Sequence, residues 1–261
     1  ESAFQSDAAT NQAKTVSFGE ISQTANDATN ALTVDITDNA FTNNVTTVSF
    51  ATGVKAASLK IGDNAFKSTK LQSVVFPAVN ANVFTVGANA FEGGTAYTTV
   101  SLGNLTPLYA AGNVDIQNAA FKGGKKVVTI GNVSATTLNG TAVAREVTIG
   151  DNAFEGTQSV QIAASGDITP SKLAIGESAF ACTELESVVL GNINSADYTI
   201  KAKAFQGGKL NTVTIGNLLG GETNAKILDQ AFENTNTADV IDQTITIGNL
   251  SATGLDIKAN A

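Results

Sequence analysis

Apolar residues recur at a spacing of two just before each Ala-Phe pair of the chain. In "LKIGDNAF", which ends at Phe66, Leu59 and Ile61 stand seven and five residues ahead of the Phe. Alternate residues of a β-strand point to the same face, so this spacing is typical of a strand that buries one side. The pattern predicts one short strand per repeat that leads through a turn into Ala-Phe.

A second alternating pattern follows Ala-Phe, as in "LQSVVFP" at 71–77 and "LNTVTIGN" at 210–217. The residues expected to point inward on this strand are Val74/Phe76, Val100/Leu102, Val128/Ile130, Val188/Leu190, Val213/Ile215 and Ile245/Ile247. Gly-Asn ends most copies and is expected to turn the chain, because both residues tolerate positive φ. Each repeat is therefore predicted to contain two short parallel strands.

The Ala-Phe pair occurs nine times, ending at Phe4, Phe41, Phe66, Phe91, Phe121, Phe154, Phe180, Phe205 and Phe232. The eight intervals span 228 residues, a mean of 28.5, which is the period of a solenoid whose units bury their core only by stacking. We predict a mainly β solenoid of about nine coils, forming a single array over residues 1–261. The chain opens with "ESAFQS" and closes with "LDIKANA", both partial copies of the repeat, so we expect a fragment of a longer array.

The Phe of each repeat is expected to fill the core. Ala precedes it in every copy, which indicates a position where the neighbouring coil leaves no room for a longer side chain. An exposed aromatic ladder that stacks on sugars is the alternative, and the fixed register beside Ala favours burial. The predicted structural spine comprises Phe41, Phe66, Phe91, Phe121, Phe154, Phe180, Phe205 and Phe232.

The segment "LKIGDNAFKSTKLQSVVFP" at 59–77 resembles the BspA-like leucine-rich repeats, also called the Treponema pallidum type, and "LAIGESAFACTELESVVLGN" at 173–192 is similar. The resemblance extends over essentially the whole chain. It implies a right-handed superhelix and a secreted or cell-surface location, and several such proteins act as adhesins. The chain departs from the family pattern where Cys commonly follows Ala-Phe, since only Cys182 does so here, and where Pro ends the strand, since only Pro77 remains.

Composition argues against several functions. The chain has no His, Trp or Met and one Cys, which removes most side chains used for metal binding, acid–base catalysis and thiol chemistry. A net charge of −8 and a single arginine, Arg145, argue against nucleic acid as a partner. No apolar run approaches the roughly 18 residues of a membrane helix, so no membrane insertion is expected. We predict no enzyme activity and no cofactor.

Two features of the turns have a chemical interpretation and a structural one. The acidic residues three positions before the Phe could form a ladder of Ca²⁺ sites; they are Asp38, Asp63, Asp151, Glu177 and Asp229. Calcium requires six to eight oxygen ligands, so turn residues that bond to local backbone are the favoured interpretation. The glycine after the strand could start a phosphate loop, but no Lys-Ser/Thr follows it, and turn geometry is favoured. Cys182 is interpreted as a small core or turn residue.

The outward positions of the second strand are the candidate ligand face, because they are small, β-branched or neutral in every copy, with no carboxylate, base or aromatic. They are Thr15, Ser17, Thr47, Ser49, Ser73, Val75, Thr99, Ser101, Val127, Thr129, Ser159, Gln161, Ser187, Val189, Thr212, Thr214, Thr244 and Thr246. One reading is that Thr and Val simply suit an exposed strand. The other is a docking surface for an extracellular protein or glycan. We predict a non-enzymatic surface or secreted binding protein, an adhesin; a spacer or stalk and a carbohydrate-active enzyme are the alternatives.

Overall fold

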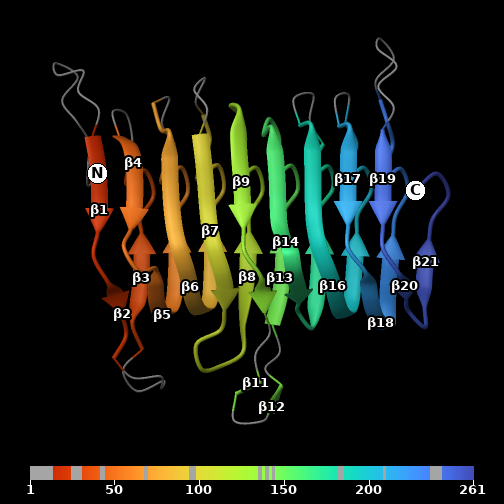
Figure 1. The fold of residues 1–261 in the computed structure, drawn as a ribbon, viewed down its shortest axis with the longest axis horizontal. Coiled ribbons are helices and arrows are strands. Elements are labelled where there is room, and N and C mark those ends of the chain that lie inside the picture. Colours follow the sequence, from red (N-terminus) through yellow and green to blue (C-terminus); the bar gives the residue numbers. More distant parts are fainter. Residues whose placement is uncertain are drawn as a thin grey trace.

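The computed structural model describes residues 14–24, 31–41, 45–67, 70–93, 98–134, 137–138, 141–142, 145–181, 185–207, 210–235 and 243–261. Two residues assigned from sequence, Phe4 and Cys182, lie outside these ranges. The described chain consists of strands and turns without a helix, and its main-sheet strands all pair in parallel. The predicted β solenoid is confirmed, with coils stacked from the N-terminal to the C-terminal end (Figure 1).

The strands form three parallel ladders, numbered in the order in which the chain visits them. Some strands belong to one ladder only. Those of ladder 1 are β1 (Lys14–Phe18), β4 (Val45–Phe50), β9 (Lys126–Ile130), β17 (Thr212–Ile215) and β19 (Thr244–Ile247). Those of ladder 2 are β2 (Ile21–Ser22), β10 (Val133–Ser134) and β20 (Leu250–Ser251). Those of ladder 3 are β3 (Thr33–Ile36), β8 (Gly112–Ile116), β13 (Arg145–Ile149), β15 (Lys172–Ile175) and β21 (Leu255–Ile257).

Longer strands bend at a corner and continue from one ladder to the next. Strands β7 (Thr98–Thr106) and β14 (Ser159–Thr169) join ladders 1 and 2, and β5 (Val54–Ile61) and β18 (Leu218–Ile227) join ladders 2 and 3. Strands β6 (Ser73–Val86) and β16 (Ser187–Ile200) run through all three.

The prediction of two strands per coil was therefore wrong, because each coil contributes to three ladders. Ladder 1 contains nine strands in the described residues, from β1 to β19. We number the coils 1 to 9 along it; the seven inner coils have a neighbour on both sides. Ladder 2 escaped prediction because its segments turn one large apolar side chain inward, such as Val79, Leu105 or Leu218. Where a second apolar residue follows at a spacing of two, as at Ala81, it is only an alanine, so the alternation is weak.

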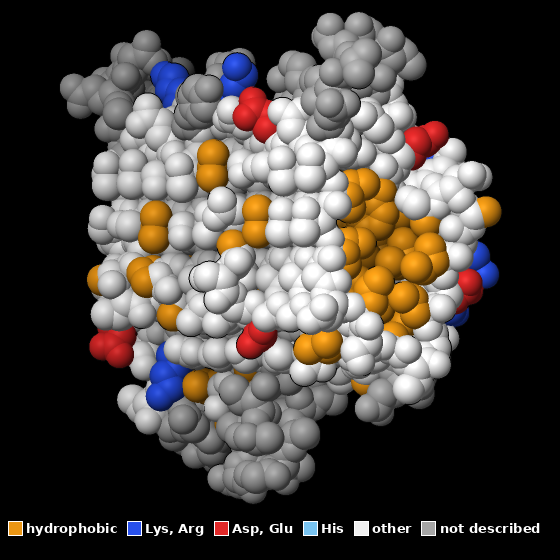
Figure 2. Space-filling model, turned by 45° about the vertical axis from the view of Figure 1, so that its right-hand side comes forward, with side chains coloured by type: hydrophobic (Ala, Val, Ile, Leu, Met, Phe, Trp, Pro, Cys, Tyr) orange, Lys and Arg blue, Asp and Glu red, His pale blue; other side chains and the backbone are white. Residues whose placement is uncertain are grey.

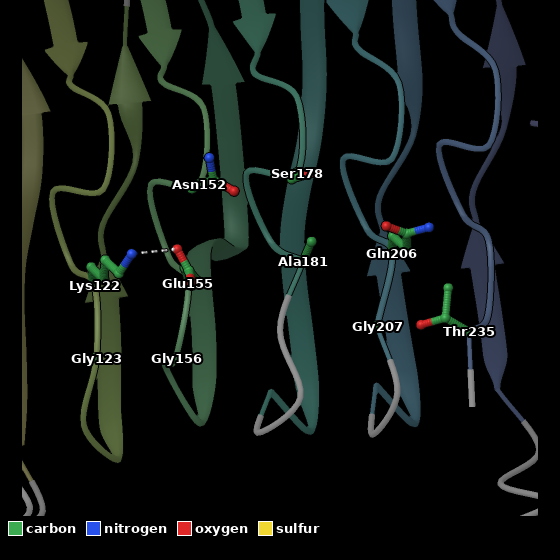
Figure 3. Close-up of a pocket in the computed structure, with 10 residues that line it drawn as sticks. All are labelled: Lys122, Gly123, Asn152, Glu155, Gly156, Ser178, Ala181, Gln206, Gly207 and Thr235. Carbon is green, nitrogen blue, oxygen red and sulfur yellow. Dashed lines mark ion pairs between the residues drawn. The ribbon is translucent and has the colours of Figure 1, made fainter. Parts of the chain in front are cut away.

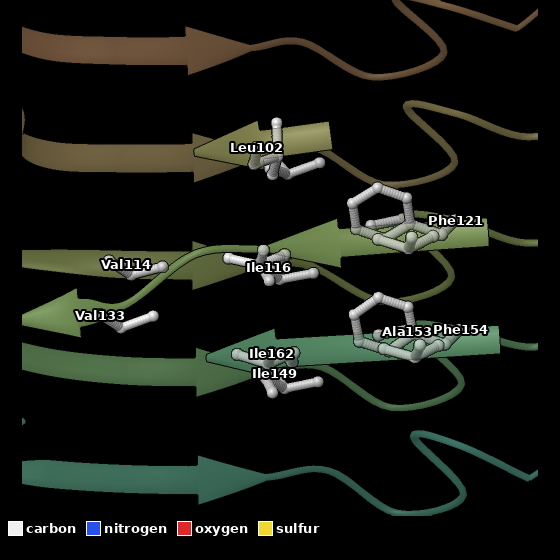
Figure 4. Packing of buried hydrophobic residues seen from close by; sticks show 14 of the residues in the cluster. Leu102, Val114, Ile116, Phe121, Val133, Ile149, Ala153, Phe154 and Ile162 are labelled. Atoms are coloured by element: carbon white, nitrogen blue, oxygen red, sulfur yellow. The ribbon is translucent and has the colours of Figure 1, made fainter. Parts of the chain in front are cut away.

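The core is a closely packed interior of Val, Ile, Leu, Ala and Phe between the ladders (Figure 4). The inward pairs predicted for ladder 1 are buried, as at Val74 and Phe76, except in the last coil, where Ile245 is 40% exposed and Ile247 is partly buried. Ladder 3 contributes the residues five and seven positions before the Phe, such as Ile61 and Leu59, which are fully buried. Coils thus share one continuous core, as expected for a solenoid.

Phenylalanine rings stack face to face along one corner of the core. Rings of the spine from Phe41 to Phe232 lie 4.9–5.0 Å apart between centroids and within 1–7° of parallel. Since carbon atoms in contact lie about 3.5–4.0 Å apart, this spacing means that the rings are offset, as aromatic pairs prefer. All are buried from Phe41 to Phe205, and Phe232 is partly buried against the core.

The alanine before each Phe lies where coils approach each other. Its side chain is buried in every described coil, and its carbonyl accepts the backbone N–H of the Phe in the preceding coil. For example, the Phe66 N–H donates to the Ala90 carbonyl at 2.7 Å. The turn residue two positions before the Phe has positive φ, from Asn39 at 58° to Gln230 at 57°. The turns therefore continue the coil-to-coil hydrogen bonding of the strands.

The Asx residues of the turns bond across coils and not locally. Asp63 Oδ1 accepts the N–H of Ala88 in the next coil, and Asn104 Oδ1 accepts that of Asn132. The glycine of the next coil makes room: a β-carbon on Gly131 would lie 2.5 Å from Asn104 Oδ1. The explanation of Gly-Asn by positive φ was wrong, because neither residue of Gly131-Asn132 has it.

Two insertions project from one side of the solenoid near its middle (Figure 1). One is the connection 107–111 between β7 and β8, and the other contains the antiparallel hairpin of β11 (Thr137–Leu138) and β12 (Thr141–Ala142). Asn82 Oδ1 accepts the N–H groups of Leu108, Tyr109 and Ala110 at 2.9, 2.9 and 3.1 Å. The side chain of Asn82 thus binds three successive N–H groups of the first insertion and ties it to coil 3.

Candidate binding surfaces

The outward positions of ladder 1 lie in two continuous rows across all nine coils. Parallel pairing in strict register aligns one row from Thr15 to Thr244 and the other from Ser17 to Thr246. The structure therefore brings together every residue of the candidate ligand face. At ~4.8 Å between strands, eight intervals give rows about 38 Å long. Their use as a ligand surface stays a prediction.

The chemistry of this face is neutral hydrogen bonding. Of its 18 positions, 14 are Ser or Thr, three are Val and one is Gln161, with no charged side chain. Hydroxyls pair with one another in places, as between Ser17 and Ser49 at 3.1 Å and between Ser159 and Ser187 at 3.0 Å. Because a hydroxyl donates one hydrogen bond and accepts others, the face can match peptide or sugar groups without an ionic partner.

A second concave surface lies along the turn edge that follows the Phe spine (Figure 3). This groove has a volume of about 370 Å³. Glycines at the second position after the Phe form its floor, and its polar residues include Lys122, Glu155 and Gln206. The groove could not be predicted from the sequence, because it depends on which side chains neighbour each other from coil to coil.

Two buried cations were not recognised from the sequence. Lys126 is 1% exposed, its Nζ donates to the carbonyls of Gly93 and Lys122 at 2.9 and 3.2 Å, and burial lowers its pKa to about 8, with Glu92 partly opposing the shift. Arg145 is fully buried, its Nη2 donates to the Ala81 carbonyl at 3.2 Å, and burial lowers its pKa to about 10. Lys126 thus holds turn carbonyls, and Arg145 lies at the base of the hairpin insertion.

The acidic turn residues do not gather into one site. The side chains of Asp38, Asp63 and Asp151 accept backbone N–H groups of the next coil. Within the described ranges, no three His, Cys, Asp or Glu side chains lie close enough to hold a metal ion. Glu155 is the one carboxylate among the described residues around the groove.

Hydrophobic side chains gather at the C-terminal end of the solenoid (Figure 2). Ile245, Leu250 and Ile257 of coil 9 are 40%, 50% and 55% exposed, since coil 9 stacks only on coil 8 within residues 1–261. In the part of the chain that the structure describes, no helix is long and apolar enough to cross a membrane.

The three ladders, the stacked Phe spine and the in-register outer face define a repeat protein of the parallel β-solenoid class. The family described as BspA type leucine-rich repeat region matches residues 12–135 and 114–239, with six copies of the repeat. The chain therefore belongs to this family, whose members are commonly surface-associated binding proteins. A search of curated proteins found no match, and a search of solved structures found none either.

Proposed function

We propose that the protein is a non-enzymatic, secreted or cell-surface adhesin, and that the outer face of ladder 1 binds an extracellular protein or glycan. The observation that carries the proposal is the two-row face of Ser, Thr and Val, which extends over nine strands without a charged position. Solenoids commonly bind partners through such extended surfaces. Membership of the BspA type family supports a binding role.

The face suits a ligand that is itself extended and neutral. Desolvation of hydroxyls costs less than desolvation of charges, so a ligand can cover many coils without a buried unpaired ion. Each coil offers nearly the same groups, so affinity would come from many weak contacts in register and not from one central residue. Removing whole coils should therefore weaken binding progressively.

The test compares two substitutions in coil 5 that add the same charge to opposite sides. Thr129→Glu places a carboxylate in the middle of the ladder 1 face, and Thr148→Glu places one on the outer side of ladder 3. Binding is measured on glycan arrays and on immobilised extracellular matrix proteins. We expect Thr129→Glu to lose at least tenfold in affinity and Thr148→Glu to retain wild-type affinity. Equal losses in both variants would refute the assignment of this face.

The spacer alternative predicts that the array alone binds none of these ligands and that only a neighbouring part of the parent protein does so. The enzyme alternative predicts turnover of a polysaccharide, which requires two carboxylates about 5–10 Å apart across a cleft. Mass spectrometry of oligosaccharides incubated with the protein tests this alternative directly. Cleavage that persists through further purification and is lost in Glu155→Gln would place the protein among hydrolases and contradict our proposal.

A further inference from the structure

The residue directly after the spine Phe forms a ladder of charged and polar side chains on the turn edge, here called the polar ladder. Its members from coil 2 to coil 8 are Lys67, Glu92, Lys122, Glu155, Ala181, Gln206 and Glu233. Neighbours pair across coils: Lys67 with Glu92 at 2.7 Å, Lys122 with Glu155 at 3.1 Å, and Gln206 with Glu233 at 2.6 Å. The charge alternates in sign from Lys67 to Glu155, and this alternation ends at Ala181.

Ala181 leaves a gap in the polar ladder. The ring of Phe180, the residue before Ala181, lies 5.0 Å from the ring of Phe154 and 4.9 Å from the ring of Phe205. Glu155 and Gln206 follow the two outer Phe residues, so they are attached to the chain about 10 Å apart. Figure 3 shows the short side chain of Ala181 between them. The groove of about 370 Å³ opens at this point, within the usual size range of ligand sites, about 300–1,000 Å³.

The groups around the gap favour a cation. Glu92 has a lysine on each side along the polar ladder, whereas Glu155 has Lys122 on one side and Ala181 on the other. Ser178 and Asn152 add a hydroxyl and an amide to the lining of the groove, and Gly156 packs closely against the backbone of Gly123. A net charge of −8 also attracts basic partners over longer distances.

We propose that the groove at Ala181 binds a lysine or arginine side chain of a partner protein. The ammonium or guanidinium group takes the position that alternation leaves vacant beside the Glu155 carboxylate, within reach of the Gln206 amide oxygen. The aliphatic stem lies over Ala181 and Gly156, which both line the groove. This site is on the turn edge and does not depend on the role proposed for the ladder 1 face.

The first experiment titrates the protein with blocked Gly-Lys-Gly and follows backbone amide resonances by NMR. We expect shifts at Glu155, Ala181 and Gln206 that saturate at millimolar peptide, with arginine in place of lysine acting similarly. The same peptide with acetyl-lysine, which lacks the charge, should bind at least tenfold more weakly. Equal shifts from the acetylated peptide, shifts from a neutral oligosaccharide alone, or no shift at these residues would each overturn the proposal.

Matched variants separate the site from general charge effects. Glu155→Gln should reduce peptide affinity at least tenfold, while Glu92→Gln, which removes the corresponding carboxylate from a position flanked by two lysines, should change it less than twofold. Ala181→Lys should abolish binding by filling the gap with the chain's own cation. Ala111→Lys adds the same charge at an exposed position of the first insertion and should leave binding intact. A retained affinity in Ala181→Lys would refute the site.

Discussion

The Oδ1 atom of Asp63 lies 2.5 Å from the place that a β-carbon on Gly87 would occupy, and it accepts the N–H of the next residue, Ala88, at 2.9 Å. An Asx side chain that accepts this N–H therefore requires a glycine in the following coil. The other Asx turns of ladder 3 follow the same rule: Asp38 precedes Gly62, Asn118 precedes Gly150, and Asp151 precedes Gly176.

Turns without this bond confirm the relationship. Where Ala88, Glu177 or Ala202 occupies the Asx position, the next coil carries Gln117, Lys201 or Leu228 in place of the glycine. Asp229 is followed by Lys258, and its carboxylate accepts no backbone N–H of coil 9 in the described structure.

A double-mutant cycle tests the coupling between Asp63 and Gly87. Gly87→Ala should cost about 1–3 kcal/mol through steric conflict, and Asp63→Ala about 1 kcal/mol through the lost hydrogen bond. The double variant should cost less than the sum, because removal of the carboxylate relieves part of the conflict. Urea unfolding measures all three, and Asp229→Ala, expected near zero, is the control. Strict additivity would contradict the steric explanation.

The Phe spine should dominate stability. Phe154→Ala removes a fully buried ring that stacks on Phe121 and Phe180, and we expect a loss of about 3–5 kcal/mol in the free energy of unfolding. Phe154→Leu should cost less, because it leaves a smaller cavity. Phe232→Ala should also cost less than Phe154→Ala, since Phe232 is only partly buried. Equal losses at Phe154 and Phe232 in urea unfolding would argue against a burial-dependent spine.

The positive-φ turn position offers a stabilising substitution. Ala119 has φ 55°, whereas the same position is Asn at 89 and 152 in the flanking coils. The left-handed conformation costs most L residues about 1–2 kcal/mol, and Asn adopts it more easily. Ala119→Asn should raise stability by about 0.5–1 kcal/mol, seen as a higher melting temperature. Ala174→Asn, on an ordinary strand, should lower it; a gain at both positions would point to another cause.

Burial of Lys126 should make stability depend on pH in the alkaline range. Its pKa is lowered from 10.5 to about 8, so between these values the unfolded chain holds a proton that the folded chain has released. Stability therefore rises with pH through this window, by about 3 kcal/mol in total from this group. Lys126→Met should remove the rise, and the exposed Lys125→Met should preserve it, as measured by urea unfolding at pH 7.5, 8.5 and 9.5. A rise unchanged in Lys126→Met would contradict the assignment.

The parts of the fold that the sequence predicts are those with a repeated pattern. Alternation marks the inward residues of ladders 1 and 3, and the nine Ala-Phe pairs mark the spine. Ladder 2 could have been found from the single apolar residue that follows Gly-Asn, as at Leu105, Val133 and Leu218, but one residue has no period. The Asx–Gly relationship can also be found in the sequence, if each repeat is compared with the next repeat and not with a consensus of all repeats.

The two candidate surfaces also differ in whether the sequence predicts them. The ladder 1 face follows from strand periodicity, because residues at equal positions in successive repeats must stack when strands pair in register. The groove does not follow from strand periodicity, since it depends on Ala181 lying between Glu155 and Gln206. These three residues are separated by whole repeats in the sequence. Nothing in the local sequence of any one coil distinguishes that position.

The sequence by itself thus determined the repeat, its inward and outward positions and the family, because these depend on periods within one coil. Only the tertiary structure decided ladder 2, the bonds between the Asx side chains and the next coil, the burial of Lys126 and Arg145, and the gap at Ala181. Each of these depends on contacts between residues one or more repeats apart, at distances set by the stacking of neighbouring coils.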